Sequence, residues 1–163
     1  CLTLGAQMLL LGKKAETEQE AREKLLAVIK DGSALQKLAE FVEAQGGDAA
    51  AVYDTARLPK ASLTKEVKAD KDGFVGHINC EEVGVCSLIL GGGRETKESC
   101  IDLSVGIVLQ KKTGDNVLSG DTLAVLYANE RDKMEEAERR LKLAYRITNE
   151  MPQKRSLIKG VIS

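Results

Sequence analysis

Apolar side chains recur at helical spacing through the N-terminal third of the chain. Residues 2–11 are mostly apolar and predict a buried helix. Thr17 and Glu20 have the spacing of a capping box, and the apolar positions after them predict a helix over residues 17–31. A second spacing of the same kind begins at Ser33 and predicts another helix up to a Gly-Gly pair. The sequence therefore predicts a helical hairpin.

Beyond residue 62 the pattern changes to short alternating segments separated by turn residues. Alternation over residues 65–69, a turn over 70–73 and a partner segment over 74–78 predict a β-hairpin. Residues 105–110 and 122–128 are rich in Val, Ile and Leu, which predicts two more strands.

An apolar run over residues 81–90 is compatible with a strand or with a short buried helix. We favour the helix, because Asn79 can cap its beginning and the glycines at 91–93 can end it.

A last helix is predicted to begin at Asn129, and residues 157–162 are predicted to add a closing strand. The buried stripe of this helix consists of Met134, Ala137, Leu141, Ala144 and Tyr145. Acidic and basic residues four positions apart predict three ion pairs on its solvated face: Glu135–Arg139, Glu136–Arg140 and Glu138–Lys142.

These elements predict an α+β fold in which the helices come first. Residues 1–54 form a helical segment, residues 55–61 form a linker that contains Leu58-Pro59, and residues 62–163 form a small α+β domain.

The composition of the chain argues against two classes of partner, nucleic acids and membranes. The 163 residues contain 24 Lys+Arg and 25 Asp+Glu, for a net charge of −1, so no overall positive field attracts nucleic acid or an anionic membrane. Aromatic residues make up only 3% of the chain, and no apolar run reaches the ~20 residues of a membrane span. We therefore expect neither nucleic acid nor a membrane as a partner.

The cysteines and the histidine do not predict a metal site. Cys1, Cys80, Cys86 and Cys100 form no CxxC pair and do not cluster with His77, the single histidine. Their spacing is also unlike a dense disulfide framework, which favours reduced thiols in a cytoplasm.

The segment Gly91-Gly92-Gly93-Arg94 combines backbone amides with a guanidinium, as phosphate loops do. Such loops lead into the N-terminus of a helix, whereas these glycines follow the predicted helix over residues 81–90. A helix stop with a tight turn is the favoured interpretation.

Single residues that could carry chemistry also have structural explanations. His77 lies in a predicted strand, and the sequence does not fix which way it faces. The cysteines have no flanking cations that would lower a thiol pKa. The carboxylates of Glu81, Glu82, Asp102, Asp115 and Asp121 are all plausible caps or turn residues. The sequence therefore predicts no catalytic, cofactor-binding or metal-binding residue in this chain.

Two stretches, VKADKDGFVGHI and KKTGDNVLSGDTLAVLYAN, resemble the two halves of a biotinyl/lipoyl-type barrel-sandwich. Carrier domains of that fold present a modifiable lysine within an EAMKM-like hairpin, and this chain has no such sequence. The resemblance implies a barrel-sandwich-like domain that is not a carrier.

Read from end to end, the chain resembles the C-terminal part of the pyrimidine-nucleoside phosphorylases, the family that includes thymidine phosphorylase. The similarity follows the order LTLGAQMLLLGKKAET, FVEAQGGD, RLPKA, LGGGR and KESCIDLSVGIVLQKKTGDNV, and covers essentially the whole chain. The resemblance implies that residues 1–54 complete a large α/β domain and that residues 62–163 form the family's C-terminal α+β domain.

For the parent enzyme, the resemblance implies a cytoplasmic pentosyltransferase that acts in nucleoside salvage. Inorganic phosphate attacks the anomeric carbon of a pyrimidine nucleoside, which releases the base and a pentose 1-phosphate. The family's catalytic motifs and its monovalent-cation site lie upstream of Cys1, so this fragment alone is expected to be inactive and to support the phosphate-binding lobe. The resemblance also implies a homodimer, with the rest of the parent chain as the fragment's partner.

Two other interpretations stay open. The first is a free-standing scaffold or binding domain of the barrel-sandwich type. The second is a lipid-anchored module that begins at Cys1, although an apolar segment rather than a polar tether follows that residue. A chain that begins with Cys rather than Met is expected to be a piece of a longer protein.

Overall fold

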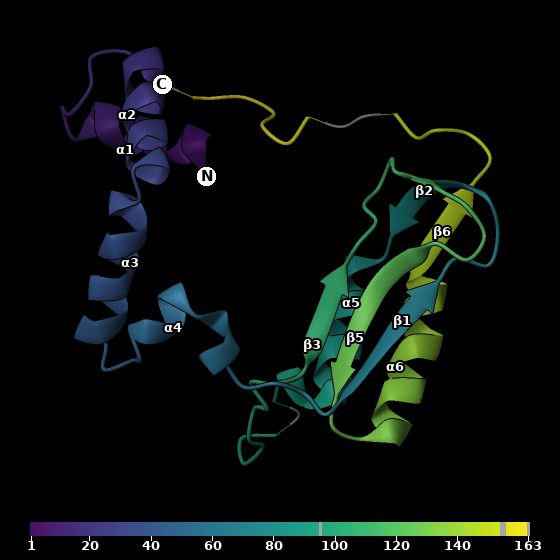
Figure 1. Ribbon diagram of the computed structural model, residues 1–163. Helices are drawn as coiled ribbons and strands as arrows, with labels where there is room; N and C mark the ends of the chain where they lie inside the picture. The colour runs from purple at the N-terminus through teal and green to yellow at the C-terminus, as the bar shows by residue number, and fades with distance from the viewer. Residues whose placement is uncertain (95, 154–155, 163) are drawn as a thin grey trace. The chain divides into compact units, whose positions relative to one another are not determined.

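A computed structural model describes residues 1–94, 96–153 and 156–162. The chain divides into two compact units, unit 1 (Cys1–Leu58) and unit 2 (Pro59–Ser163) (Figure 1). Each unit is described by itself.

Unit 1 is helical. It contains α1 (Leu2–Leu11), α2 (Glu18–Lys30), α3 (Ser33–Ala44), the short α4 (Ala50–Tyr53) and a 3-10 turn, η1 (Thr55–Arg57). The three predicted helices are thus confirmed.

The capping residue predicted for α2, Thr17, is confirmed, whereas the one predicted for α3, Ser33, is wrong. The Thr17 hydroxyl accepts a hydrogen bond from the backbone N–H of Glu20 at 3.2 Å, as predicted. The Ser33 hydroxyl instead donates to the Val28 carbonyl at 3.4 Å. Asp31 does the capping, since its carboxylate accepts from the N–H of Ser33 at 2.9 Å.

Unit 1 buries little apolar surface. Its buried core consists of three alanines, Ala6, Ala15 and Ala21. Large apolar side chains of its helices are exposed instead: Leu4, Met8, Leu11, Leu26, Ile29, Leu35, Leu38 and Phe41. The helix predicted to be buried over residues 2–11 is therefore only partly covered: Ala6 is buried, whereas Leu4, Met8 and Leu11 are exposed.

The described residues of unit 2 form two small antiparallel sheets, which confirms a mixed α+β fold. One sheet has the order β1-β5-β3, formed by β1 (Leu63–Lys68), β5 (Thr122–Ala128) and β3 (Gly106–Leu109) (Figure 1). The other has the order β4-β2-β6, formed by β4 (Asn116–Val117), β2 (Gly73–Ile78) and β6 (Tyr145–Thr148).

The predicted β-hairpin over residues 65–78 is wrong. β1 pairs with β5, whereas β2 pairs with β4 and β6, so the two segments belong to different sheets. The connection between them is bonded to other turns, because Ala69 exchanges backbone hydrogen bonds with the Gly120-Asp121 turn. Because of those bonds, the connection does not form the tight turn that would have paired β1 with β2.

The predicted helix after Asn79 is confirmed as α5 (Cys80–Ser87), which continues into a π-helical turn, η2 (Leu88–Gly92). The Asn79 side chain accepts from the N–H of Glu82 at 3.3 Å. α5 packs against α6 (Arg131–Ala144), and α6 contacts β1 and β5. The core between these elements includes the fully buried side chains of Val67, Val75, Val117, Leu126 and Leu141.

The end of α6 differs from its prediction. The helix ends at Ala144, and Tyr145 opens β6 rather than extending the helical stripe. Tyr145 is still buried, and its hydroxyl donates to two backbone carbonyls, which an extended backbone makes possible here. Residues 157–162 contain no strand, so the closing strand predicted there is wrong.

One of the three predicted ion pairs on α6 is present, Glu138–Lys142 at 3.3 Å. Arg139 pairs with Glu136 at 2.8 Å instead of Glu135. Arg140 pairs with Glu82 of α5, because the packing of the two helices brings that carboxylate within reach.

Candidate functional site

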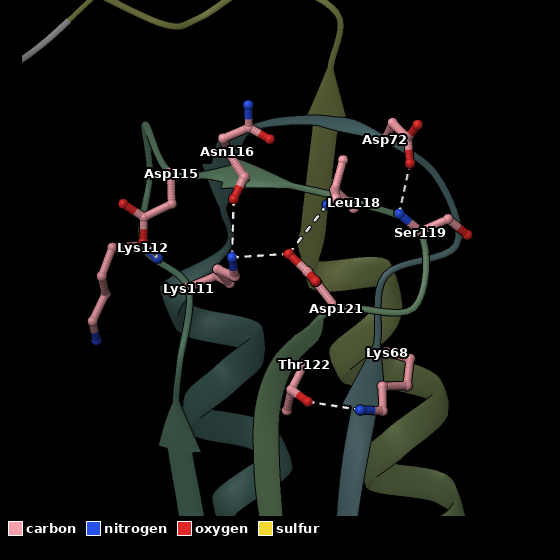
Figure 2. A network of polar contacts seen from close by, with 10 residues as sticks. All are labelled: Lys68, Asp72, Lys111, Lys112, Asp115, Asn116, Leu118, Ser119, Asp121 and Thr122. Carbon is pink, nitrogen blue, oxygen red and sulfur yellow. Dashed lines mark hydrogen bonds and ion pairs between the residues drawn. The ribbon is translucent and has the colours of Figure 1, made fainter.

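Figure 2 shows a network of polar contacts around the turns that flank β4. We call this set the turn network; it consists of Lys68, Asp72, Lys111, Lys112, Asp115, Asn116, Leu118, Ser119, Asp121 and Thr122.

The first turn of the network runs from Lys112 to Asp115. The Asp115 carboxylate accepts from the backbone N–H of Lys112 at 2.7 Å, and Gly114 has a φ of +99°, which favours glycine. This turn binds β2 through two backbone hydrogen bonds, from the N–H of Gly114 to the Val75 carbonyl at 2.8 Å and from the N–H of Val75 to the Asp115 carbonyl at 2.9 Å.

The second turn, from Leu118 to Asp121, repeats this geometry. The Asp121 carboxylate accepts from the N–H of Leu118 at 3.2 Å, and Gly120 has a φ of +88°. Gly120 donates to the Ala69 carbonyl, and Ala69 donates to the Asp121 carbonyl, both at 2.8 Å. The two Gly-Asp turns are therefore equivalent, and both aspartates have the turn role that the sequence predicted.

Lys111 joins the two turns. Its ammonium donates to the Asn116 carbonyl and to the Asp121 carboxylate, each at 3.0 Å (Figure 2). This ammonium, followed by the N–H of Leu118, lowers the pKa of the Asp121 carboxyl below its ordinary value. Such a carboxylate stays ionised and acts as an acceptor, not as a general acid.

The network also reaches the connection between β1 and β2. The N–H of Ser119 donates to the Asp72 carboxylate at 2.7 Å, and the Lys68 ammonium donates to the Thr122 hydroxyl at 2.8 Å (Figure 2). These contacts hold loops in place.

A second cluster, the corner cluster, is formed by Ser62, Asp102, Ser104 and Asn129. The Asn129 amide donates to the Asp102 carboxylate at 2.7 Å and to the Ser104 hydroxyl at 2.8 Å, and its carbonyl oxygen accepts from the N–H of Ser62 at 2.8 Å. Bonds from Ser104 and then Asn129 lower the pKa of Asp102. The sequence indicated Asp102 as a turn residue but missed Asn129, whose partners are far away along the chain.

The glycines at 91–93 lie at the end of the α5–η2 helical segment, as predicted. Gly91 has a φ of +102° and its carbonyl accepts from the N–H of Asp102 at 2.9 Å. A helix C-terminus presents carbonyls rather than N–H groups, so the segment lacks the dipole of a phosphate loop.

His77 and the cysteines are not brought together. His77 is exposed on β2, opposite Arg146, beyond a register shift that follows the buried Val75. Cys86 is fully buried, and this burial, with a smaller contribution from the Glu82 charge, raises the pKa of its thiol. The other three cysteines are exposed.

The two acidic residues at the start of α5 lie in its first turn. Glu81 is exposed, and Glu82 forms the ion pair with Arg140. Among residues 1–94, 96–153 and 156–162, no three His, Cys, Asp or Glu side chains form a set that could hold a metal ion. In the same part of the chain, every helix is too short or too polar to cross a membrane.

Comparisons with known proteins identify the family. Residues 74–148, from β2 to β6, match the sequence model described as "Pyrimidine nucleoside phosphorylase C-terminal domain". All 163 residues align at 44% identity with a pyrimidine-nucleoside phosphorylase of Geobacillus stearothermophilus. The chain belongs to the pyrimidine-nucleoside phosphorylase family. It matches the C-terminal portion of that family, which confirms the resemblance found in the sequence.

Two further family members carry the same name. The Bacillus subtilis (strain 168) protein is 51% identical over 128 residues, which are 78% of this chain, and the Staphylococcus aureus (strain USA300) protein is 47% identical over 131 residues, or 80%. The chain spans 37% of the length of the Geobacillus relative, and the matches span 30% of the other two. The pyrimidine-nucleoside phosphorylases that it matches are therefore much longer.

Proposed function

We propose that this chain is the C-terminal part of a pyrimidine-nucleoside phosphorylase. The parent enzyme would use inorganic phosphate to cleave a pyrimidine nucleoside into the free base and a pentose 1-phosphate. The observation that carries the proposal is the 44% identity over the entire chain to a protein named for this activity.

Unit 1 would complete a larger α/β domain of the parent. The exposed apolar side chains on α1, α2 and α3 support this role, because stable domains rarely leave so many large apolar side chains uncovered. A three-alanine core contributes little hydrophobic stabilisation, so these helices need a partner surface.

Unit 2 would form the C-terminal α+β domain, with a barrel-sandwich arrangement. The two equivalent Gly-Asp turns support that arrangement, since each holds one of two chain segments, around Ala69 and Val75, by the same pair of backbone bonds. The domain boundary would fall in the linker over residues 55–61, where the two compact units also meet in sequence.

The contribution of unit 2 to the reaction would be mechanical. Its polar side chains hold turns, whereas the groups that bind nucleoside and phosphate would lie in the portion of the family that this chain does not span. A stiff lobe keeps bound reactants in register when a cleft closes around them, which lowers the entropic part of the barrier.

Several properties of the parent follow from the same proposal. Inorganic phosphate would be its co-substrate, and a monovalent cation would bind in the preceding portion rather than in this chain. The parent would be a cytoplasmic homodimer, and this portion alone would be inactive.

The proposal is tested on the full-length protein that carries this sequence. We expect release of thymine or uracil from their nucleosides that requires added phosphate, and no release by residues 1–163 alone. A full-length variant that lacks residues 62–163 should lose activity and folding together. Retention of both would contradict the supporting role, and absence of phosphate-dependent release from the intact protein would contradict the enzyme assignment.

The mass of the native polypeptide, captured from the source cell with an antibody, separates the proposal from its alternative. A chain more than twice 17.6 kDa supports a phosphorylase. A native chain of 17.6 kDa would favour a free-standing scaffold or binding domain, and an acyl mass on Cys1 would favour a lipid-anchored module.

A further inference from the structure

Unit 2 has a hollow with an unusual concentration of positive charge. The hollow has a volume of about 390 Å³ and is lined by four cationic side chains, Lys68, Lys71, Lys142 and Arg146, with a single carboxylate, Asp70. We call it the basic hollow. This balance contrasts with the net charge of −1 of the whole chain.

The four cations come from different elements. Lys68 ends β1, Lys71 follows it in the β1–β2 connection, Lys142 lies in the last turn of α6, and Arg146 belongs to β6. The tight junction between α6 and β6 places the last two only four residues apart on the rim. The buried side chains of Leu123 and Tyr145 contribute to the lining.

Two of the four cationic side chains have an acidic partner in the structure. Lys68 pairs with Glu66 and donates to the Thr122 hydroxyl. Lys142 pairs with Glu138 at 3.3 Å, and its place at the C-terminus of a helix is favourable for a cation.

The other two cations are not neutralised. Among the described residues, neither Lys71 nor Arg146 forms an ion pair or a side-chain hydrogen bond, and both are exposed. Asp70, the carboxylate of the lining, has no ion pair with either of them. A small anion in the hollow would be attracted by both the ammonium and the guanidinium.

We propose that the basic hollow binds a small anion that carries phosphate oxygens, of the pyrophosphate or phosphate-ester class. A guanidinium can bind two phosphate oxygens with a fork of parallel hydrogen bonds, and the lysines add point charges that suit a multivalent anion. The volume lies within the range of small-molecule sites. A nucleic acid fits less well, because the chain has few aromatic side chains on which bases could stack.

The proposal of this anion site does not rest on the proposed phosphorolysis. The test is calorimetric titration of the full-length protein with sodium pyrophosphate at low ionic strength, with sodium sulfate as a smaller anion of lower charge for comparison. We expect saturable pyrophosphate binding that weakens with added salt, and weaker binding of sulfate.

The decisive comparison uses a double variant, Lys71→Ala with Arg146→Ala. Losing two charge-assisted contacts should weaken pyrophosphate binding by about tenfold or more. The matched control is Lys112→Ala, which removes an exposed lysine of unit 2 that does not line the hollow and should change nothing. A third variant, Arg146→Lys, keeps the charge without the fork and should bind with intermediate affinity.

If wild type and the double variant bound pyrophosphate with equal affinity, the proposed site would be overturned. The same holds if Lys112→Ala weakened pyrophosphate binding as much as the double variant does. Phosphate-dependent base release is measured on the same preparations and should survive in the double variant. If no preparation releases base, the phosphorylase proposal fails while the titration still decides the hollow. Unchanged thermal midpoints of the variants confirm that the surface substitutions leave the fold intact.

Discussion

The hydroxyl of Tyr145 offers a measurable test of how unit 2 is held together. It donates to the Lys111 carbonyl at 3.0 Å and to the Leu123 carbonyl at 3.2 Å, from a side chain that is only 7% exposed. Leu123 keeps two other donors, the N–H groups of Gln110 and Lys111, when this hydroxyl is removed. The substitution Tyr145→Phe therefore removes a hydrogen-bond donor mainly from the Lys111 carbonyl.

The expected loss of stability is about 1 to 2 kcal/mol, one net hydrogen bond plus part of the cost of leaving a carbonyl unpaired. Urea denaturation followed by circular dichroism measures it, and the slope with urea should not change. Tyr53→Phe is the control, because Tyr53 is 61% exposed and should lose less than about 0.5 kcal/mol. If Tyr145→Phe matched this control, the two hydrogen bonds would be no better than those the hydroxyl makes with water.

Alkaline titration tests the same hydroxyl independently. Burial, with smaller contributions from the charges of Asp115 and Cys80, raises the pKa of Tyr145 to about 12. An unfolded tyrosine titrates near roughly pH 10. Since the folded-state pKa is the higher one, the stabilisation is complete below pH ~10 and is lost as the pH rises towards 12. The advantage of wild type over Tyr145→Phe should shrink across that interval, and a constant difference would contradict the assignment.

Three further changes have distinct expected outcomes. Leu141→Ala removes a fully buried side chain and should cost about 2 to 5 kcal/mol in urea denaturation, against under about 0.5 for the exposed Leu143→Ala. Gly73→Ala would place a Cβ 2.5 Å from a β6 carbonyl at a φ of +147° and should lower the thermal midpoint, whereas Gly106→Ala, in open space, should not. Asp121→Asn removes a carboxylate whose pKa is lowered by its lysine partner; the advantage of wild type should be full above roughly pH 4 and vanish as the pH falls through the folded-state pKa, measured by urea midpoints.

Local signals in the sequence predicted the helices well. The bonds of Thr17 and Asn79 to backbone N–H groups each span three residues, so the residues that decide these helix starts lie next to each other in the sequence. The Gly-Asp turns were recognisable for the same reason, because Asp115 and Asp121 each accept from a residue three positions earlier. Their role in the candidate site was therefore predictable.

Strand pairing was not predictable from local pattern. Alternation indicates which side chains face a core but not which strand lies alongside, and β1 pairs with β5 more than 50 residues later. The same limit explains the missed partners of Arg140 and Asn129, which lie on α5 and in loops brought close only by tertiary packing. Helical periodicity continues up to Tyr145 and predicts a helix there, whereas its buried hydroxyl needs the carbonyls that an extended backbone reaches.

The placement of polar groups in unit 2 constrains how it could affect a reaction. Lys111 and Asp121, the central ion pair of the turn network, are both bonded to backbone groups of the turns that flank β4. Because these two side chains are engaged in holding the turns, they can affect a reaction elsewhere in the protein only through the position of the domain or the fraction of it that is folded. On heating the full-length Asp121→Asn variant, the proposed phosphorolysis and the structure of unit 2 should therefore be lost together, with activity equal to wild type while the domain is folded. A loss of activity well below the unfolding temperature would instead mean that this ion pair takes part in the reaction.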